Sequence, residues 1–520
     1  MIGSMDQFEI VNAVLSICLD AGVRDAVVSP GSRNAPLMIA LKRNFPEFRV
    51  YSVVDERSAA YKAIGISDVS GRPVVLICTS GTAAANYLPA VCEAFHRAVP
   101  LIVITADRPA RLVTARDGQT IFQEHLFGRH VDAYFGLDPE TNTENILQLL
   151  DALSSTLSVA SRPVHINLHL DEPLYQWRVK YPWPADKRMP KRNSGHTFET
   201  DELNGSLKPM VVIGQSKPGK LPADLLRKLV EKGFLVVSGG LSNLPPEYCV
   251  GHFNQLAVHE LPQPDLVITV GGEITHKPLK QYLKRIDKLK HLHVEKTLYP
   301  PDTFGKGVRL IHAEAEDYLL WLTAQPAEVG IEFVQLWLQY DQSAEDVQFR
   351  TQEREIANYY LPLAMAAFEQ QVLLALGNSA VVRKFLNVPK RFHRNLYGNR
   401  GTAGIDGTLS AAVGMALATE LPVWCLIGDL SFFYDVNALW QVPYPENLTI
   451  FVFNDHRGSI FEMIEGPKDF PEIFELQSTP HPFNCEHIAR HFGLKYARIE
   501  EKLDAHTISK HQGGLVEIML

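Results

Sequence analysis

The sequence predicts an α/β protein with three doubly wound domains, each built on a parallel sheet. Short apolar runs typical of buried parallel strands alternate with segments of helical periodicity along most of the chain. Polar clusters follow the carboxyl ends of several runs, where open α/β sheets bind their ligands. A length of 520 residues suits roughly three or four domains. We place the domain boundaries at residues 1–181, 182–345 and 346–520.

The first domain is predicted from five apolar runs with helix-like segments between most of them. The runs cover residues 26–28, 50–54, 74–78, 101–105 and 164–168. Residues 177–208 are polar and rich in Pro, Lys, Arg and Asn, which indicates a surface linker after this domain.

The other two domains repeat the same alternation. Strands of the second domain are predicted at residues 211–213, 234–237, 266–270, 292–294 and 310–312. A charged, glutamine-rich stretch with helical spacing, residues 323–355, predicts a connecting helix. Strands of the third domain are predicted at residues 372–376, 423–427, 448–453, 496–499 and 515–520.

Composition excludes several classes of protein. A formal net charge of −9 gives no support for nucleic-acid binding. No apolar run reaches the length of a membrane span, and the acidic, amphipathic amino end differs from a signal peptide. The six scattered cysteines include no C-x-x-C pair, so buried reduced thiols are expected rather than disulfides or zinc ligands. We therefore expect a cytoplasmic protein without a stable membrane anchor.

Two acidic residues follow predicted strands of the third domain. Asp429 follows the run 422–427, and Asp455 follows the run 448–453. If these strands are neighbours, both carboxylates can meet one hard cation such as Mg²⁺, which prefers oxygen ligands and commonly keeps phosphate oxygens among them. The Ser431 hydroxyl and the backbone N–H groups that start the next helix also suit a phosphate. The interpretation is a metal-bridged diphosphate site, and the alternative is two unrelated acids in strand-end loops.

Polar clusters also follow strands of the first domain. In the first cluster Gly31 permits a sharp turn, and Ser32 or Asn34 can cap the next helix. Arg33 would then stand over the strand ends, where its planar guanidinium can bind a carboxylate. The alternative for this cluster is a capped turn with a solvated arginine.

The second cluster contains Asp55, a suitable helix N-cap, and Glu56 in the first helical turn. The helix dipole alone explains an acid at this position. The functional interpretation is a partly buried carboxylate that exchanges a proton with a cofactor nitrogen.

The remaining two clusters are candidates for ligand contact. Residues 79–86 form a small-residue loop that opens a helix, but the loop lacks the lysine of a phosphate-binding P-loop. The alternative for this loop is a tightly packed helix start. Arg108 and Gln119 can hydrogen-bond an anionic substrate, whereas an exposed Asp107–Arg108 turn is the alternative for the former.

These motifs resemble those of a known class of enzymes. Gly428-Asp429 with Asn454-Asp455 is similar to the fingerprint of thiamine-diphosphate enzymes, and Glu56 resembles their cofactor-activating glutamate. Longer stretches resemble, in the same order, the 2-succinyl-5-enolpyruvyl-6-hydroxy-3-cyclohexene-1-carboxylate synthase (MenD) family of menaquinone biosynthesis. These stretches are SPGSRNAPL, DERSAAYKAIGIS, TSGTAAANYLPA, TADRP, PVHINLHLDEPLY, GNSAVVR, NRGTAGIDGTLSAAVG and GDLSFFYDVNAL. The middle domain is similar only in architecture and around Thr275-His276-Lys277.

The resemblance implies how the three domains divide the work. It implies a pyrimidine-binding first domain, a central domain without a cofactor of its own and a diphosphate-binding third domain. In this family the cofactor lies between the first domain of one subunit and the third domain of its partner. A homodimer is therefore the expected minimum active unit, and a homotetramer is consistent with the resemblance.

The activity that the resemblance implies is that of a transferase. Such an enzyme decarboxylates 2-oxoglutarate and adds the resulting carbanion to isochorismate by conjugate addition, giving 2-succinyl-5-enolpyruvyl-6-hydroxy-3-cyclohexene-1-carboxylate. A second hypothesis is a thiamine-diphosphate-dependent 2-oxoacid decarboxylase or an acetolactate-type carboligase, whose smaller substrates need fewer cations. A third is a non-catalytic regulator that binds a nucleotide or a cofactor on the same architecture.

The resemblance also assigns roles to individual residues. Glu56 would hydrogen-bond N1′ of the cofactor aminopyrimidine and assist proton exchange there. Mg²⁺, or Mn²⁺ in its place, would be held by Asp429, Asp455 and the carbonyl of Arg457. The implied cofactor-binding residues are Glu56, Ser379, Ile405, Asp429, Leu430, Ser431, Asp455 and Ile460. The implied substrate-binding residues are Ser32, Arg33, Arg108, Gln119, Lys277, Asn378, Arg383, Arg400 and Phe461.

Three positions depart from the pattern of the family. Asp455 stands where the family usually has Asn, which adds a negative charge beside the diphosphate. His456-Arg457 replaces residues that are commonly small, so this pair either crowds the site or points outward. Pro278 stands where some relatives carry Arg, which removes one possible substrate cation.

Overall fold

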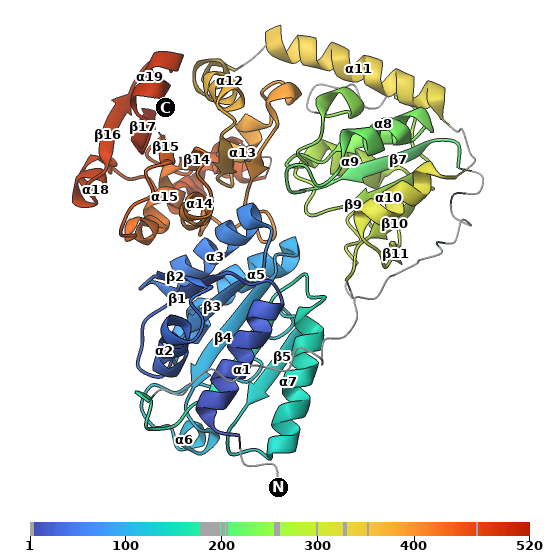
Figure 1. Ribbon diagram of the computed structural model, residues 1–520. Coiled ribbons are helices and arrows are strands. Elements are labelled where there is room, and N and C mark those ends of the chain that lie inside the picture. The colour runs from blue at the N-terminus through green and yellow to red at the C-terminus, as the bar shows by residue number, and fades with distance from the viewer. Residues whose placement is uncertain are drawn as a thin grey trace. The chain divides into compact units, whose positions relative to one another are not determined.

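The described residues form three parallel sheets with alternating helices, which confirms the predicted fold class (Figure 1). The computed structural model describes residues 5–176, 198, 203, 206–253, 261–297, 300–325, 330–350, 353–463 and 466–520. The predicted linker, residues 177–208, lies mostly outside the described residues. The chain forms two compact units. The first comprises Met1–Asn193, Gly401–Val423 and Leu430–Leu448, and the second comprises Ser194–Arg400, Trp424–Asp429 and Thr449–Leu520.

The first sheet belongs to the first compact unit and has the strand order β2-β1-β3-β4-β6-β5. Its strands are β1 (Asp25–Val28), β2 (Arg49–Ser52), β3 (Val74–Cys78), β4 (Leu101–Asp107), β5 (Ala133–Leu137) and β6 (Val164–His169). The helices of this region are α1 (Gln7–Asp20), α2 (Ala35–Arg43), α3 (Glu56–Ser70), α4 (Thr82–Asn86), α5 (Leu88–Arg97), α6 (Ala110–Thr114) and α7 (Thr143–Leu157).

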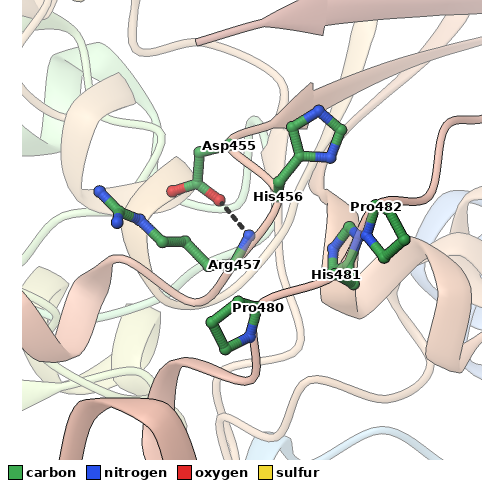
Figure 2. A pocket seen from close by; sticks show the side chains of 6 residues that line it. All are labelled: Asp455, His456, Arg457, Pro480, His481 and Pro482. Carbon is green, nitrogen blue, oxygen red and sulfur yellow. Dashed lines mark hydrogen bonds between the residues drawn. The ribbon is translucent and has the colours of Figure 1, made fainter.

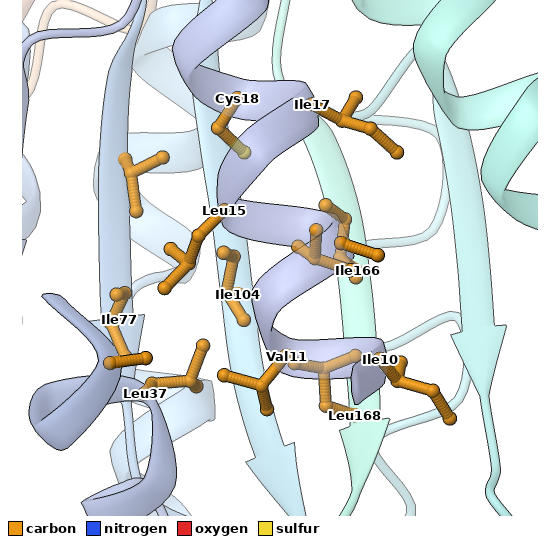
Figure 3. Packing of buried hydrophobic residues seen from close by; sticks show 14 of the residues in the cluster. Ile10, Val11, Leu15, Ile17, Cys18, Leu37, Ile77, Ile104, Ile166 and Leu168 are labelled. Carbon is orange, nitrogen blue, oxygen red and sulfur yellow. The ribbon is translucent and has the colours of Figure 1, made fainter. Parts of the chain in front are cut away.

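Helices cover both faces of this sheet because its strands are apolar on both sides. One core cluster joins α1, α2 and α7 to one face, and another joins α3 and α5 to the opposite face. Figure 3 shows the first cluster, in which Val11 and Leu15 of α1 pack against Ile77 of β3 and Ile104 of β4. A capping box fixes the start of α1, since the Asp6 carboxylate accepts from the Glu9 N–H at 3.0 Å and the Glu9 carboxylate accepts from the Asp6 N–H at 2.9 Å.

Three strands of this sheet differ from the sequence prediction. Strand β5 was not predicted, because its residues form a half-buried edge strand without a continuous apolar run. Strand β2 ends at Ser52 rather than at residue 54, since the chain leaves the sheet to start α3. Strand β4 continues to Asp107, which is 2% exposed and accepts a hydrogen bond from Asn167 at 2.9 Å. The alternative of an exposed Asp107–Arg108 turn is therefore wrong.

The second sheet lies in the second compact unit and has the order β11-β10-β9-β7-β8. Helices α9 and α11 pack on one face, and α8 and α10 pack on the other. The predicted connecting helix is α11, which begins later than residue 323, where α10 ends. The elements are β7 (Pro209–Ile213), α8 (Ala223–Glu231), β8 (Leu235–Ser238), η2 (Pro246–Tyr248), β9 (Leu266–Val270), α9 (Lys277–Arg285), β10 (Lys290–Val294), β11 (Arg309–Ile311), α10 (Ala315–Thr323) and α11 (Ile331–Arg350).

The third sheet has the order β13-β12-β14-β15-β17-β16, so β14 and β15 are neighbours as the proposed two-acid site requires. Edge strand β13 has two residues and was not predicted, because so short a pairing leaves no pattern in the sequence. The strands are β12 (Leu373–Leu376), β13 (Leu396–Tyr397), β14 (Val423–Gly428), β15 (Leu448–Asn454), β16 (Lys495–Ile499) and β17 (Gly514–Met519). The helical segments are η4 (Ile356–Tyr360), α12 (Leu361–Glu369), α13 (Ala380–Phe385), η5 (Lys390–Phe392), α14 (Thr408–Leu417), α15 (Asp429–Tyr434), η6 (Val436–Leu439), α16 (Ile460–Met463), η7 (Pro467–Asp469), η8 (Pro471–Ile473), α17 (Phe474–Ser478), α18 (Glu486–His491) and α19 (Ala505–Lys510).

Helices α3 and α14 approach each other closely inside the first compact unit. A Cβ atom on Gly65 would lie 1.9 Å from the carbonyl oxygen of Ala411, and one on Gly414 would lie 2.0 Å from that of Lys62. Each helix therefore needs a glycine where the backbone of the other passes. This contact brings the start of α3, and with it Glu56, to Gly401–Val423 of the same unit.

The sequence also led to predictions for the state of the cysteines and for membrane-spanning segments. All six cysteines are free thiols, and every one except the half-buried Cys92 is buried, as predicted. Among the helices that the structure describes, none has the length and apolar character needed to cross a bilayer.

Four buried histidines are held in the neutral form. Burial lowers the pKa of His165 and His393 to about 3 and that of His276 and His291 to about 4. An unfolded histidine titrates near 6.5. Between pH 6.5 and about 4 the unfolded chain therefore binds more protons than the folded chain at these positions.

Stability should consequently fall as the pH drops through this window, because the neutral rings contribute stability above pH 6.5 that is lost on acidification. We expect each histidine to lower the free energy of unfolding by roughly 1–2 kcal/mol when the pH falls from 7.5 to 5. Urea unfolding at both pH values measures the change, and His276→Phe should flatten it by removing one titrating ring. An unfolding free energy that is constant over this range would contradict the assignment.

Substitution of Gly414 by Ala should destabilise the first compact unit, because the new methyl group has no space against the Lys62 carbonyl. We expect a loss of about 1–3 kcal/mol, the usual cost of overpacking. Thermal and urea unfolding measure it. Gly118→Ala is the matched control, since a Cβ at Gly118 meets nothing within 4 Å. Equal stability of the two variants would show that the helices can separate without cost.

Candidate active site

Asp429 is held by a histidine that the sequence analysis did not identify. The carboxylate sits at the start of α15, where the helix dipole favours an anion, and it is 3% exposed. His481 Nε2 lies 3.2 Å from Asp429 Oδ2, and the Phe483 N–H donates to His481 Nδ1 at 3.2 Å. Burial lowers the pKa of His481. Because Nδ1 accepts a hydrogen bond, Nε2 carries the ring proton and donates a hydrogen bond to Asp429.

Asp455 lies in a tight loop that follows β15. Asn454, the last residue of that strand, accepts the His456 N–H on its Oδ1 at 2.9 Å. The Asp455 carboxylate accepts the Arg457 N–H at 3.2 Å, and His456 has a φ of 59°. The side chains therefore fold back onto the backbone of the loop, which is the Asx-turn geometry that Asn and Asp favour.

Asp455 and His481 line one pocket, and His481 contacts the Asp429 carboxylate. This pocket has a volume of about 480 Å³, and Figure 2 shows the side chains that line it. The segment that contains His481 closes one side of the pocket, because the backbone N–H of His481 donates to the His456 carbonyl at 2.9 Å. Arg457 turns its side chain outward, where its guanidinium lies 3.3 Å from Glu462. The pocket is lined by Asp455, His456, Arg457, Pro480, His481 and Pro482.

A buried carboxylate supports this loop from the neighbouring strand. Glu517 of β17 is fully buried and accepts from Asn454 Nδ2 at 2.7 Å, from the Cys485 N–H at 3.1 Å and from the Tyr496 hydroxyl at 2.5 Å. Three donors satisfy the charge that burial would otherwise penalise. The signal in the sequence is the single acid inside the apolar run 515–520, which the sequence analysis did not use.

Glu56 begins α3, as predicted, directly after the N-cap Asp55, whose carboxylate accepts the Ser58 N–H at 3.1 Å. The Glu56 side chain is half-buried, and within the described residues no hydrogen bond or ion pair engages it. Burial is the main cause of the raised pKa of Tyr87 and of Cys78, which ends β3, and the charge of Glu56 raises both pKa values further. A half-buried carboxylate without a protein partner is suited to a ligand nitrogen.

The residues flanking Glu56 contact the segment that follows Asp429. Asn437 donates to the Asp55 carboxylate at 2.8 Å, and the Arg57 guanidinium donates to the Tyr434 carbonyl at 2.8 Å. In the same compact unit the Ser431 hydroxyl donates to the carbonyl of Ile405, whose side chain is 44% exposed. Both predicted cofactor contacts therefore belong to the unit that carries Glu56. Leu430, in the same helix as Ser431, is half-buried.

Arg33 and Arg108 lie close together, as the predicted substrate site requires. Burial and then the charge of Arg108 lower the pKa of Arg33, which is 6% exposed. Arg33 donates to the Leu170 carbonyl at 2.9 Å and lies 3.7 Å from Glu172. Arg108 lies 3.2 Å from Asp117. Both cations are thus paired with acids of their own chain.

The predicted Gln119 lines a second pocket, of about 370 Å³, in the same unit. Its side-chain amide donates to the Ser80 carbonyl at 3.1 Å, and a Cβ on Gly81 would lie 3.0 Å from its Cγ. Gly81 has a φ of 85°, a conformation that favours glycine, and the small-residue loop borders the pocket. Ser32 is exposed, and the helix after it is preceded by Asn34, whose amide donates to Ser29 rather than capping the helix.

The remaining predicted substrate residues belong to the second compact unit. The Arg400 guanidinium donates to Asn378 Oδ1 at 2.8 Å. Arg383 donates to the carbonyl of Ser379, a residue with a φ of 69° that precedes α13. Lys277 is exposed at the start of α9. Ile460 and Phe461 are half-buried at the start of α16, beside the Asp455 loop.

Within the described ranges, no group of three or more His, Cys, Asp or Glu side chains could hold a metal ion. A site built on Asp429 and Asp455 has two such side chains and would need a carbonyl and ligand oxygens to complete it.

Comparison with known proteins defines the class of enzyme. Residues 8–133 match the family described as thiamine pyrophosphate enzyme, N-terminal TPP binding domain, and residues 375–512 match the corresponding C-terminal TPP binding domain. These matches contain Glu56 and the two acids after β14 and β15, and they define a thiamine pyrophosphate enzyme.

Full-length relatives narrow the class further. A 2-succinyl-5-enolpyruvyl-6-hydroxy-3-cyclohexene-1-carboxylate synthase from Cytophaga hutchinsonii is 34% identical over 96% of this chain and 91% of the relative. Synthases of the same name from Desulfotalea psychrophila and Flavobacterium johnsoniae are 35% and 30% identical, over 92% and 98% of this chain and 91% and 95% of the relatives. The chain belongs to this synthase family.

Proposed function

We propose that the protein is a thiamine-diphosphate-dependent transferase that decarboxylates 2-oxoglutarate and adds the resulting four-carbon unit to isochorismate. The product is 2-succinyl-5-enolpyruvyl-6-hydroxy-3-cyclohexene-1-carboxylate, on the pathway to menaquinone. The observation that carries this proposal is the near-complete coverage of the chain by relatives of that name. The unpartnered carboxylate of Glu56 and the paired arginines described above support it chemically.

The residues present fit the cofactor and a divalent cation. When bound, thiamine diphosphate supplies the electron sink that decarboxylation of a 2-oxoacid requires. Asp429, Asp455 and the Arg457 carbonyl would hold Mg²⁺, or Mn²⁺, and Ser431 and Ser379 would bind phosphate oxygens. His481 supports this assignment, because its N–H holds a carboxylate oxygen of Asp429 beside the pocket that Asp455 lines.

Glu56 would hold a proton at the pyrimidine nitrogen N1′. Its side chain is half-buried and has no partner among the described residues, so it can share a short hydrogen bond with a ring nitrogen. Proton exchange at this atom is general acid–base assistance to the cofactor. Ile405 and Ile460 would flank the cofactor rings, and the 44% exposure of the Ile405 side chain supports such a contact.

The cationic residues would bind the substrates, since both 2-oxoglutarate and isochorismate carry two carboxylates. A guanidinium can take a carboxylate through two parallel hydrogen bonds, which fixes orientation as well as charge. In a site shielded from water, such cations are costly until an anion pairs with them. The proposed substrate-binding residues are Ser32, Arg33, Arg108, Gln119, Lys277, Asn378, Arg383, Arg400 and Phe461.

The proposal includes an assembly and a division into domains. The pyrimidine-binding domain, residues 1–181, would act with the diphosphate-binding domain, residues 346–520, of a second subunit, with residues 182–345 between them. At least a homodimer, and a homotetramer built from it, is the proposed assembly. We propose a cytoplasmic location, which the six free thiols support.

The alternative function is a 2-oxoacid decarboxylase or an acetolactate-type carboligase. Incubation of the protein with 2-oxoglutarate, with and without isochorismate, separates the two functions. The synthase should release CO₂ and form the six-membered-ring product only when both substrates are present. CO₂ release at the same rate without isochorismate would favour the decarboxylase.

Substitution of Glu56 by Gln should reduce product formation by roughly 10²–10⁴-fold, because the amide cannot exchange a proton with the cofactor nitrogen. Turnover with both substrates measures the loss. Glu47→Gln, at an exposed acid of the same domain, is the control and should keep wild-type activity. Normal turnover by Glu56→Gln would contradict the proposed role and would favour a non-catalytic binding protein.

Substitution of His481 by Ala should weaken binding of thiamine diphosphate in the presence of Mg²⁺ by roughly 10–100-fold, since Asp429 loses the donor that orients it. Isothermal titration with the cofactor at fixed Mg²⁺ measures the affinity. His481→Gln, which keeps an N–H donor, should recover part of the loss. Equal affinity in wild type and His481→Ala would show that Asp429 does not depend on this contact.

A further inference from the structure

Glu273, an acidic residue outside the predicted site, forms an ion pair with Arg400. Glu273 follows β9 in a turn that contains Gly271, with a φ of 80°. The turn is tightly packed, because a Cβ on Gly214 would lie 2.0 Å from the Gly272 carbonyl oxygen. Gly271 is required for its conformation and Gly214 for the close approach.

Gln215 fastens the turn of Glu273 to the segment that precedes Arg400. The Gln215 N–H donates to the Glu273 carbonyl at 3.0 Å, and the Gln215 side chain donates to the Gly398 carbonyl at 2.6 Å. One residue therefore fixes the backbone on both sides of the ion pair. The backbone positions both residues of the ion pair, so the pair does not depend on the chance approach of two flexible side chains.

The ion pair occupies one edge of the Arg400 guanidinium. Glu273 Oε2 accepts from Nε at 3.1 Å and lies 3.0 Å from a terminal nitrogen of the same group. The other terminal nitrogen donates to Asn378 at 2.8 Å. In the described part of the chain, hydrogen bonds engage two of the five N–H groups of Arg400 and the ion-pair contact lies beside a third, so the others can face a ligand. Arg400 is 7% exposed, so its orientation is constrained.

Further cations gather around the same carboxylate. Lys280 donates to Glu273 Oε1 at 3.2 Å, and Thr275 donates to Oε2 at 3.1 Å. Partial burial and then the charge of Arg400 lower the pKa of Arg383, while the charge of Glu273 raises it. Arg383, Arg400 and Lys280 with Glu273 form a group, hereafter the Glu273 cluster, that has a net charge of about +2. A dicarboxylate would neutralise it.

We propose that Glu273 is a positioning residue that holds one edge of Arg400 so that the remaining N–H groups face a substrate carboxylate. This inference rests on the proposed function, because it takes Arg400 as a substrate contact. Glu273 stays in place when substrate binds, since displacing it would also break its bonds to Lys280 and Thr275. It sets the charge of the cluster to match a dianion, and it reduces the cost of leaving buried cations unpaired.

The test compares Glu273→Ala and Glu273→Gln with the wild type. Removing the carboxylate should raise KM roughly tenfold for isochorismate or for the oxoacid, with kcat changed by less than about threefold. Glu273→Gln keeps an acceptor oxygen for Arg400 and should show a smaller rise. Glu316→Gln is the charge control, since Glu316 is an exposed acid at the start of α10.

A binding measurement makes the test independent of turnover. Glutarate has the chain of 2-oxoglutarate without the keto group, and calorimetric titration should give a roughly tenfold weaker affinity for Glu273→Ala than for wild type. If the wild type binds glutarate but forms no product, the proposed function fails and the role of Glu273 is still decided by the titration. Unchanged Michaelis constants together with an unchanged glutarate affinity in both Glu273 variants would overturn the inference. Tighter binding would also overturn it, because Glu273 would then compete with the substrate.

Discussion

A charge that is withdrawn from water must find a partner, and this constraint shapes the candidate site around Asp429, Glu517 and most of the proposed substrate arginines. Asp429 is almost fully buried and receives the N–H of His481. Glu517 is fully buried and receives three donors. Three of the four arginines proposed to meet substrate are matched by an acid, Arg33 by Glu172, Arg108 by Asp117 and Arg400 by Glu273. Isolated charges of this kind would each cost several kcal/mol, so the partners fix where the functional groups can stand.

The acidic partners of the proposed substrate arginines differ in exposure and in the number of bonds that hold them. Glu172 and Asp117 are largely exposed on their side chains, at 67% and 50%, so a ligand carboxylate can replace them at small cost. Glu273 is 30% exposed and is held by Lys280, Thr275 and Arg400 together. Glu172 and Asp117 neutralise their arginines until a ligand binds. Glu273, by contrast, is a fixed part of the proposed binding site.

Much of the fold could be predicted from the sequence, because apolar strands at the centre of parallel sheets leave a strong pattern. Edge strands β5 and β13 could not, since one is half-buried and the other has two residues. Among the proposed site residues, Asp429 stands directly after β14 and Glu56 begins the helix that follows β2, so a reading of strand ends from the sequence points to both positions. His481, Glu273 and Glu517 were missed, because their partners are far away in the sequence and a single chain carries no sign of such pairings.

The glycine contact between α3 and α14 has a consequence for how the chain is made. The two helices are separated by most of the sequence, yet their backbones touch at Gly65 and Gly414. During synthesis the first sheet emerges from the ribosome long before α14 does. Until then, the surface of α3 that α14 will cover is exposed to solvent and to other nascent chains. The amino-terminal region must therefore wait for its carboxy-terminal partner, and its final assembly is a late, long-range step of folding.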